Sequence, residues 1–401
     1  MNSFAPRILL APDKFKGCLS SREVAQAMKE GLLRVWPGAK TTICPVADGG
    51  EGTTEALVDG LNGEWREEMV VDALGRPLIS RYGIVQWQGT KTAVMEMSEA
   101  SGLAKVMDLP RDPWNASTYG TGQLFRAAVA SGAETIILGI GGSATNDGGM
   151  GMAEALGYEF QDEFNQPVWD LPANFDRVHH MVEPKHYWPR IIVACDVTNP
   201  LLGPEGCIRV YGPQKGVKPE DYERFEARLE RLAEMVRRDL GVKRDLRKHP
   251  GSGAAGGLGF GLLAFTGAEL RHGFELIADV IGLESLVKQC DLVITGEGRL
   301  DSQTLCGKGP HGVALMAKRL GKPVAGFGGI LESPLPEQFN VDFDYTAALC
   351  PVDMHCSEAV RRGASLIRDR IEFFTPDLLH LVEGNGYIEN HAHLDGIPVL
   401  A

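Results

Sequence analysis

No run of about 20 apolar residues, the length that a membrane-spanning helix requires, occurs anywhere in this 401-residue sequence. The segment from Met1 to Pro12 has one basic residue and an apolar run that is too short for the hydrophobic region of a secretory signal. The eight cysteines are scattered and form no CxxC pair, which is typical of reduced thiols. These absences predict a soluble, cytoplasmic protein that needs neither disulfides nor a membrane.

Basic residues are too few for a general nucleic-acid binder. Lys and Arg together number 40 against 53 Asp and Glu, so the formal net charge is −13. A protein that grips nucleic acid through its phosphates needs a basic face, which this balance argues against. A small anionic substrate remains possible, because a few local cations suffice to bind it. The expected partners are therefore small molecules, with neither nucleic acid nor membrane, and the sequence does not indicate an oligomeric state.

Two well-known site motifs are also missing, whereas glycine is in excess. There is no Walker A loop, since no glycine precedes Gly307-Lys308 or Gly321-Lys322 at the required spacing, and there is no HExxH. The 49 glycines exceed the roughly 28 expected for average usage. They gather in particular loops, and those loops are where we look for function.

The chain alternates between strand and helix patterns. A buried strand at 7–12, a capped helix from Ser20 to about Val35 and a strand at 41–46 form a βαβα start, which favours a parallel sheet covered by helices. Shorter alternating strands follow from about residue 68, and the first pattern returns after about residue 283. We therefore predict an α/β protein with two domains: a discontinuous domain of residues 1–68 plus 284–372, an inserted α/β domain of residues 69–283, and an aperiodic tail of residues 373–401.

The most specific loop runs from Gly139 to Gly149, between a predicted strand and a predicted helix. Its glycines let backbone N–H groups turn toward an anion, and the helix N-terminus adds partial positive charge. The alternative is a tight turn that needs small residues only for packing. A partial match to a dinucleotide fingerprint, with Glu159 as its acid, is weakened by Asp147, which would repel a pyrophosphate unless a metal intervened.

Similar loops follow other predicted strands. The clearest are Asp13-Lys14-Phe15-Lys16, Asp48-Gly49-Gly50-Glu51-Gly52, Cys195-Asp196-Val197 and the loop from Gly296 to Thr304. Glycines that alternate with charged residues at the carboxyl ends of parallel strands describe a ligand-binding edge. Charged surface loops with local ion pairs, and helix caps, are the alternatives.

Taken together, these loops contain the groups that phosphoryl transfer needs. Strand-end acids can hold Mg²⁺ and deprotonate a hydroxyl, cations can clamp anionic groups, and glycine loops can hold phosphates. The acids are Asp48, Asp147, Asp196, Glu297 and Asp301, and the cations are Lys16, Lys215, Arg299 and Lys308.

The loops also occur in a familiar order, and the chain closely resembles the bacterial glycerate kinases of the D-glycerate 2-kinase type. The resemblance covers about residues 7–371. It is carried by the segments Ala11 to Gly17, Pro45 to Gly52, Tyr119 to Gly122, Gly139 to Gly149, Val193 to Leu201, Gly212 to Gly216 and Ile294 to Thr304. It implies a two-domain α/β enzyme with one Rossmann- or flavodoxin-like domain, and the reaction of ATP with D-glycerate in the presence of Mg²⁺.

Our assignment of roles follows from the chemistry. Asp196 is predicted to accept the proton of the attacking hydroxyl, and Lys16 and Arg299 to bind the substrate carboxylate and the transferred phosphoryl group. The predicted nucleotide and phosphate ligands are Gly141, Gly142, Ser143, Thr145, Asn146 and Lys215. The predicted substrate residues are Asp48, Gly49, Gly50, Glu297, Asp301 and Ser302. The predicted metal ligands are Asp147 and Asp196.

Three alternatives stay open at this point. The same transfer can give 3-phosphoglycerate rather than 2-phosphoglycerate, although the resemblance favours the 2-position. An NAD-dependent hydroxy-acid dehydrogenase would use the Gly139 loop for its cofactor. A non-catalytic nucleotide or organic-acid sensor would bind ligand without turnover.

Overall fold

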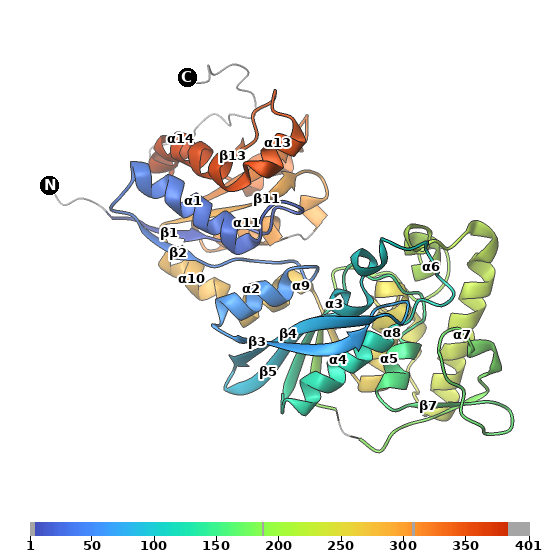
Figure 1. The fold of residues 1–401 in the computed structure, drawn as a ribbon. Coiled ribbons are helices and arrows are strands. Elements are labelled where there is room, and N and C mark those ends of the chain that lie inside the picture. Colours follow the sequence, from blue (N-terminus) through green and yellow to red (C-terminus); the bar gives the residue numbers. More distant parts are fainter. Residues whose placement is uncertain (1–4, 187, 307–308, 384–401) are drawn as a thin grey trace. The chain divides into compact units, whose positions relative to one another are not determined.

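The computed structural model describes residues 5–186, 188–306 and 309–383. Within these residues the chain divides into two compact units, residues 1–48 with 274–401 and residues 49–273. Figure 1 shows the elements of both units along the chain. Each unit has its own sheet, so the predicted α/β class is confirmed.

The sheet of the first unit is parallel and has the strand order β13-β12-β11-β1-β2. Numbered within the unit, this is the order 2-1-3-4-5 of flavodoxin-like folds, with the change of direction between β1 and β11. The resemblance left Rossmann-like and flavodoxin-like order open, and the sheet decides for the second. Its strands are β1 (Arg7–Leu10), β2 (Lys40–Ile43), β11 (Leu292–Leu300), β12 (Val324–Leu331) and β13 (Tyr345–Ala348).

Helices cover both faces of this sheet because its strands are apolar on both sides. In β1, Ile8 and Leu10 belong to one apolar cluster and Leu9 to another, as alternation along a strand requires. Helices α1 and α14 pack against each other next to the first cluster (Figure 1), where Gly31 lies directly against the backbone of Arg368. The helices are α1 (Ser21–Val35), α9 (Gly273–Val280), α10 (Leu283–Gln289), α11 (Gly309–Arg319), α12 (Gln338–Asp342), α13 (Cys356–Arg361) and α14 (Gly363–Glu383).

The predicted cap of the first helix is confirmed, whereas the predicted start of the tail is wrong. Ser20 and Glu23 form a reciprocal capping box at α1. Helix α14 continues to Glu383 through Pro376, beyond the predicted end of order at residue 372. Its last turns bury Phe374 and Leu378 in the core of the unit, and this packing outweighs the usual effect of proline within a helix. Residues 384–401 of the predicted tail lie outside the described residues.

The second unit contains a mixed sheet of order β10-β9-β6-β5-β4-β3. The strands β3, β4 and β5 are antiparallel, and β5, β6, β9 and β10 are parallel. The strands are β3 (Glu64–Val71), β4 (Pro77–Trp87), β5 (Thr90–Glu96), β6 (Thr135–Gly139), β9 (Arg190–Ala194) and β10 (Glu269–Arg271). A separate antiparallel pair is formed by β7 (Glu159–Gln161) and β8 (His180–Val182).

The α-helices of this unit are α2 (Thr53–Gly60), α3 (Ser98–Ser101), α4 (Tyr119–Ala130), α5 (Met150–Ala155), α6 (Cys207–Tyr211), α7 (Tyr222–Asp239) and α8 (Ala254–Thr266). The pattern at Phe225, Leu229, Leu232 and Val236 predicted the buried face of α7 correctly. Short 3₁₀ turns lie at η1 (Leu103–Val106), η2 (Phe175–Arg177), η3 (Pro213–Lys215), η4 (Pro219–Asp221) and η5 (Leu246–Lys248), and η6 (Thr304–Cys306) belongs to the first unit.

The boundaries of the units differ from the predicted positions 68/69 and 283/284. The contacts divide the chain at 48/49 and 273/274. Helix α2 lies on β4, where a Cβ on Gly83 would come within 2.1 Å of Val58. It therefore belongs to the second unit, although its place in a βαβα pattern assigned it to the first.

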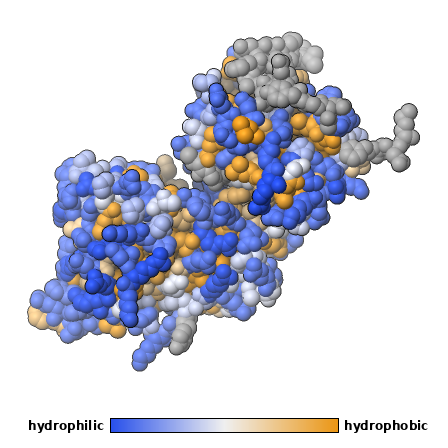
Figure 2. All heavy atoms as spheres, turned by 180° about the vertical axis from the view of Figure 1, so that it is seen from behind, coloured by the Kyte–Doolittle hydropathy of each residue, from blue (hydrophilic) through white to orange (hydrophobic). Residues whose placement is uncertain are grey.

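The surface has the mixture of polar and apolar residues usual for globular proteins. Figure 2 shows hydrophobic residues on one face in small areas among hydrophilic ones. Among the described residues, no helix combines the length and the apolar character that a membrane span needs.

Candidate functional site

Three carboxylates lie at the carboxyl ends of neighbouring strands in the first unit. Asp13 follows β1, Asp48 follows β2 and Glu297 lies in β11. The backbone N–H of Asp13 donates to the carbonyl of Gly296 at 2.8 Å, which fixes its loop against β11. In this fold order, ligands bind at the carboxyl ends of the strands where the strand order changes direction. The change lies between β1 and β11, so this acidic cluster occupies the expected position.

Asp13 is the most perturbed acid of the cluster. Its side chain is 8% exposed, and burial, with the negative charge of Asp48 next and a smaller effect of Glu297, raises its pKa to about 8. The N–H of Lys14 donates to Asp13 Oδ1 at 2.6 Å and opposes this rise. Sequence reasoning quoted this loop but gave Asp13 no role, since burial and like-charge neighbours are visible only in three dimensions.

The remaining predicted residues of this unit surround the same strand ends. Arg299 Nε lies 3.1 Å from Asp301 Oδ2, and 57% of the Arg299 side chain is exposed. Asp301 Oδ1 accepts the N–H of Gln303 at 2.9 Å, so Asp301 also closes a turn. Lys16 is exposed and lies beside Gly298 of β11. A Cβ on Gly298 would come within 3.6 Å of the backbone nitrogen of Lys16.

Two further contacts order this loop. Thr304 Oγ1 donates to Glu297 Oε1 at 2.7 Å, and the N–H of Ser302 donates to Glu332 Oε2 at 2.7 Å. The structure therefore brings Lys16, Glu297, Arg299, Asp301 and Ser302 together around the end of β11. Lys308 lies outside the described residues.

In the second unit, predicted glycines from separate segments meet at the carboxyl end of β6. A Cβ on Gly139 would lie 2.9 Å from the carbonyl oxygen of Gly49, and one on Gly141 would lie 3.0 Å from the Cα of Gly50. Gly49 itself has φ +89°, and a Cβ on it would lie 2.9 Å from the Cβ of Ala194 at the end of β9. These close backbone approaches explain why glycine is needed at the positions that the sequence analysis singled out.

Lys215 is a structural anchor of the Gly139–Gly149 loop. Its Nζ donates to Ser143 Oγ at 2.7 Å and to the carbonyl of Thr145 at 2.8 Å, and the residue is 2% exposed. Burial lowers the pKa of Lys215 to about 8. The predicted role of Lys215 as a phosphate ligand stays a prediction, and both contacts show that the ammonium group already holds the loop in shape.

This burial predicts a specific pH dependence. Between about pH 8 and 10.5 the unfolded chain binds more protons at Lys215 than the folded chain does, so the residue's contribution to the free energy of unfolding rises with pH. In Lys215→Met this rise is expected to disappear. Urea unfolding of both proteins from pH 7.5 to 10.5 measures the difference, with the exposed Lys218→Met as the matched control. If the free energy of unfolding changes with pH in the same way for the wild type and for Lys215→Met, the lowered pKa of Lys215 is contradicted.

Asp147 is engaged by protein donors at both carboxylate oxygens. Oδ2 accepts from the Thr118 N–H at 2.8 Å, from Thr118 Oγ1 at 2.7 Å and from the Gly151 N–H at 3.1 Å, and Oδ1 accepts from the Gly149 N–H at 3.2 Å. The side chain is 1% exposed. Burial raises its pKa, and these hydrogen bonds oppose the rise. The arrangement is that of a buried cap that joins α4 to α5, and the predicted metal role of Asp147 remains a prediction without geometric support.

A stability measurement separates the two roles. Asp147→Ala leaves three buried N–H groups without their acceptor and is expected to lower the free energy of unfolding by about 3 kcal/mol or more. The expected loss is the same with and without Mg²⁺. If Mg²⁺, added without other ligands, raises the free energy of unfolding of the wild type but not that of Asp147→Asn, Asp147 is a metal ligand instead.

Asn146 faces the interior. Its side-chain oxygen and nitrogen are buried and have no hydrogen-bond partner among the described residues, and it lines a small cavity with Trp114, Phe225 and Arg228. The cavity volume of about 10 Å³ is at the lower limit for holding one water molecule. It is too small for a nucleotide, so the predicted nucleotide contact of Asn146 receives no support from this cavity.

Asp196 ends β9 at the same edge of the second sheet. Its Oδ1 accepts the N–H of Gly273 at 2.7 Å and lies 3.9 Å from His272 Nδ1, and 31% of its side chain is exposed. Glu96 ends β5 nearby in the sheet and accepts the N–H of Thr54 at 2.8 Å, which caps α2. Sequence reasoning missed His272 and Glu96, because neither lies in a glycine-rich motif.

A model of the glycerate kinase family matches residues 8–376. The chain belongs to the glycerate kinase family. It is 44% identical over 329 residues to the glycerate 2-kinase of Escherichia coli K12, covering 81% of this chain and 85% of that one. It is 42% identical over 364 residues to the glycerate kinase of Halalkalibacterium halodurans, covering 90% and 95%. A crystal structure from Salmonella typhimurium LT2 named glycerate kinase 2 superposes with a TM-score of 0.83 at 40% identity, over 94% of this chain and 99% of that chain.

Membership of the glycerate kinase family makes this protein a phosphotransferase and confirms the predicted resemblance. It favours the kinase over the dehydrogenase and sensor alternatives, since phosphoryl transfer is the chemistry that defines the family name. ATP as phosphate donor follows from the same membership.

The family's kinase chemistry raises the question of where this chain can hold a cation. Among the described residues, no three acidic, imidazole or thiol side chains form a ready-made metal site. Mg²⁺ does not need one, because it is commonly held by one or two carboxylates together with substrate phosphates. The negative charges of Asp48 and Glu297 raise the pKa of Asp13, and a cation bound beside Asp13 would have the opposite effect. The acidic cluster therefore fits Mg²⁺ better than Asp147 does.

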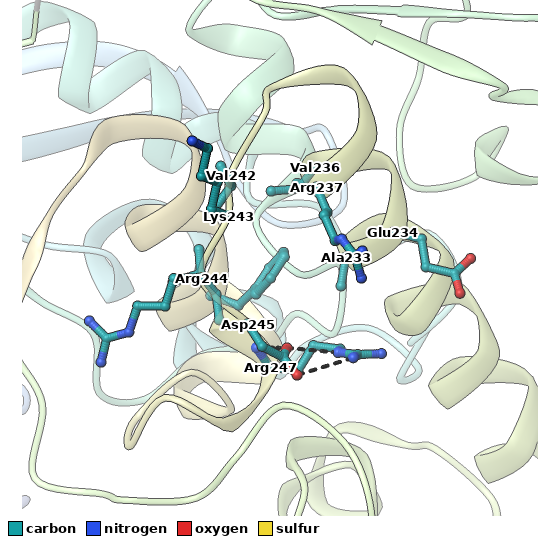
Figure 3. Close-up of a pocket in the computed structure, with 11 residues that line it drawn as sticks. Ala233, Glu234, Val236, Arg237, Val242, Lys243, Arg244, Asp245 and Arg247 are labelled. Atoms are coloured by element: carbon teal, nitrogen blue, oxygen red, sulfur yellow. Dashed lines mark hydrogen bonds and ion pairs between the residues drawn. The ribbon is translucent and has the colours of Figure 1, made fainter.

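A separate pocket lies in the second unit, beside the C-terminal half of α7. Its volume is about 240 Å³ and it is lined by Arg237, Lys243, Arg244 and Arg247 with Glu234, Asp245 and apolar neighbours. Figure 3 shows Arg244 and Glu234 extending in opposite directions and Asp245 paired with Arg247. None of the predicted site residues lines it, and we assign no chemistry to it.

Proposed function

We propose that this chain transfers the γ-phosphoryl group of ATP to the 2-hydroxyl of D-glycerate, giving ADP and 2-phosphoglycerate, in a reaction that requires Mg²⁺. The proposal is supported by the family and by the named activity of the Escherichia coli relative. The observation that carries it is the acidic cluster at the strand-order change of the first unit, with Lys16 and Arg299 beside it.

The side chains of the first unit would neutralise charge. One or two of the carboxylates of Asp13, Asp48 and Glu297, together with phosphate oxygens of the substrate, would supply oxygen ligands of the kind Mg²⁺ prefers. When bound there, Mg²⁺ would offset the negative charge of the phosphate oxygens. Lys16 and Arg299 carry largely exposed positive groups suited to the phosphoryl group and the glycerate carboxylate. The sequence analysis predicts that Asp48 and Glu297 bind the substrate. Their carboxylates would repel the carboxylate of glycerate, so they would contact its hydroxyl groups instead.

The residues of the second unit would position the phosphates and deprotonate the attacking hydroxyl group. Asp196 is partly exposed, and one of its oxygens is held by the Gly273 N–H. This leaves its orientation defined and its carboxylate suited to accept the hydroxyl proton. The close-packed glycines Gly49, Gly50 and Gly141, with Gly142 and Ser143 after them, present backbone at the carboxyl edge where phosphates are commonly bound.

A coupled assay of ADP release tests the proposed reaction. We expect release to depend on D-glycerate and on Mg²⁺, with little ADP formed when either is withheld. ADP release that is the same without D-glycerate would contradict the proposal.

The position of phosphorylation is read from the product by phosphorus NMR. In 2-phosphoglycerate the phosphorus couples to one carbon-bound proton and gives a doublet, whereas in 3-phosphoglycerate it couples to two and gives a triplet. We expect the doublet. The triplet would establish the 3-position instead while leaving the kinase activity in place.

A further inference from the structure

The strand β3 is an exposed edge of the second sheet. It is last in the strand order, and no described strand pairs with its outer side. Six of its eight residues, 64–69, are exposed, and it contains neither lysine nor proline. Natural proteins block pairing at sheet edges with proline and with charged side chains, lysine above all, so the charged residues of β3 limit its partner to a strand with complementary charges. An edge of this length is a template for another strand.

One side of this edge carries an open apolar patch. Trp65, Met69 and the Ile79 that pairs with Met69 point to the same face and are 37%, 60% and 59% exposed. Arg81 covers Trp65, with its guanidinium carbon 4.3 Å from the ring centroid. Helix α2 covers this face at Gly83, whereas Trp65, Met69 and Ile79 remain exposed.

The residues of β3 are complementary to those of a second, antiparallel β3. We propose that two copies of this chain associate through β3, about a two-fold axis that passes perpendicular to the sheet at Glu67. A two-fold axis in this direction keeps each side chain on its own face. In this register Trp65 pairs with Met69 of the other copy, and Arg66 pairs with Glu68 of the other copy.

Each pairing occurs twice by symmetry, so the interface gains two apolar and two oppositely charged cross-strand pairs. The apolar patches of the two copies then join into two symmetry-related strips, each of which runs from Ile79 through Met69 to Trp65 of the other copy. The single like-charge pair is the one between Glu67 and Glu67 of the other copy. Within each copy, Arg81 of β4 lies directly opposite Glu67. Moving the axis to Arg66 would oppose Arg66 to itself and Glu64 to Glu68, which loses both ion pairs.

This self-complementarity favours a second copy over an unrelated partner. An acidic or basic partner strand would satisfy only part of the alternating sequence Glu64-Trp65-Arg66-Glu67-Glu68-Met69. The same strand run antiparallel places opposite charges at Arg66 and Glu68 and apolar partners at Trp65 and Met69 together. The inference does not depend on the proposed reaction, because no residue of the patch belongs to the candidate site.

Charge reversal tests both the dimer and its register. Sedimentation velocity over a dilution series is expected to show a monomer–dimer equilibrium for the full chain. Arg66→Glu and Glu68→Arg each turn two ion pairs into two like-charge pairs and are expected to raise the dimer Kd by about tenfold or more. The double variant restores the opposite charges and is expected to return the Kd toward the wild-type value.

The control is Arg190→Glu, which breaks an exposed 3.4 Å ion pair with Glu269 at the other edge of the same sheet and is expected to leave the Kd unchanged. Circular dichroism confirms that each variant is folded. A protein that is monomeric at every concentration overturns the proposal. So does a dimer that Arg66→Glu does not weaken, or one that the double variant fails to restore.

Discussion

Asp13→Asn is expected to lower kcat by about 10²–10³-fold and to make the protein more stable. The loss of activity follows if Asp13 takes part in holding the cation, because the removal of one charge-stabilising group commonly costs this much. The gain in stability follows from the cost of a buried carboxylate beside Asp48 and Glu297. The amide has nearly the same shape and carries no charge.

The sign of the pH dependence is defined by the raised pKa. Between about pH 4 and 8 the folded chain binds more protons at Asp13 than the unfolded chain does, so the wild type loses stability as the pH rises through this range. Asparagine does not titrate. The excess stability of Asp13→Asn is therefore expected to grow from pH 5 to pH 8 in metal-free, nucleotide-free protein, as measured by thermal or urea unfolding.

The exposed Asp369→Asn on α14 is the matched control and is expected to change neither kcat nor the pH trend. The assignment of Asp13 fails if Asp13→Asn keeps more than a tenth of the wild-type kcat. It also fails if the variant is less stable than the wild type at pH 8.

The second large effect is expected at Asp196. Asp196→Asn should lower kcat by about 10²–10⁴-fold, the usual contribution of a positioned general base. The amide oxygen can still accept the Gly273 N–H, so the fold and the melting temperature are expected to stay near those of the wild type. Steady-state kinetics with D-glycerate and ATP measure the loss.

The exposed Asp176→Asn serves as the control, since its carboxylate is 74% exposed. A loss smaller than about tenfold in Asp196→Asn would assign the base to another residue. The two predictions are distinguishable from each other, because Asp13→Asn is expected to change both kcat and stability, whereas Asp196→Asn is expected to lower kcat with the melting temperature near that of the wild type.

Much of the fold followed from local patterns. The capping box at Ser20 and the 3/4 spacing along α7 are properties of single helices, and each is present in the structure. The start of the tail was predicted too early, because Pro376 and a weak apolar pattern do not indicate a helix. The helix forms because Phe374 and Leu378 pack into a core made of residues that are far away in the chain. The place of α2 was misjudged for the same reason, since its partner β4 comes later in the chain.

The candidate site shows a similar division. Strand-end position made Asp48 and Glu297 candidates in the first unit and Asp196 a candidate in the second, because the carboxyl ends of parallel strands lie at one edge of a sheet. Position could not separate Asp147 from them, although its oxygens are filled by Thr118, Gly149 and Gly151. Asp13 was passed over for the opposite reason, because nothing in its own segment shows its neighbours.

By itself, the sequence determined the α/β class, the family and the glycine-rich loops that carry acids and cations, because these depend on residue types at short spacing. Only the tertiary structure decided which acids are buried caps and which gather at the carboxyl ends of the strands of the first unit. The charge state and hydrogen bonding of a carboxyl group depend on solvent and on neighbours that are far away in the chain, and both are defined only once the sheets have formed.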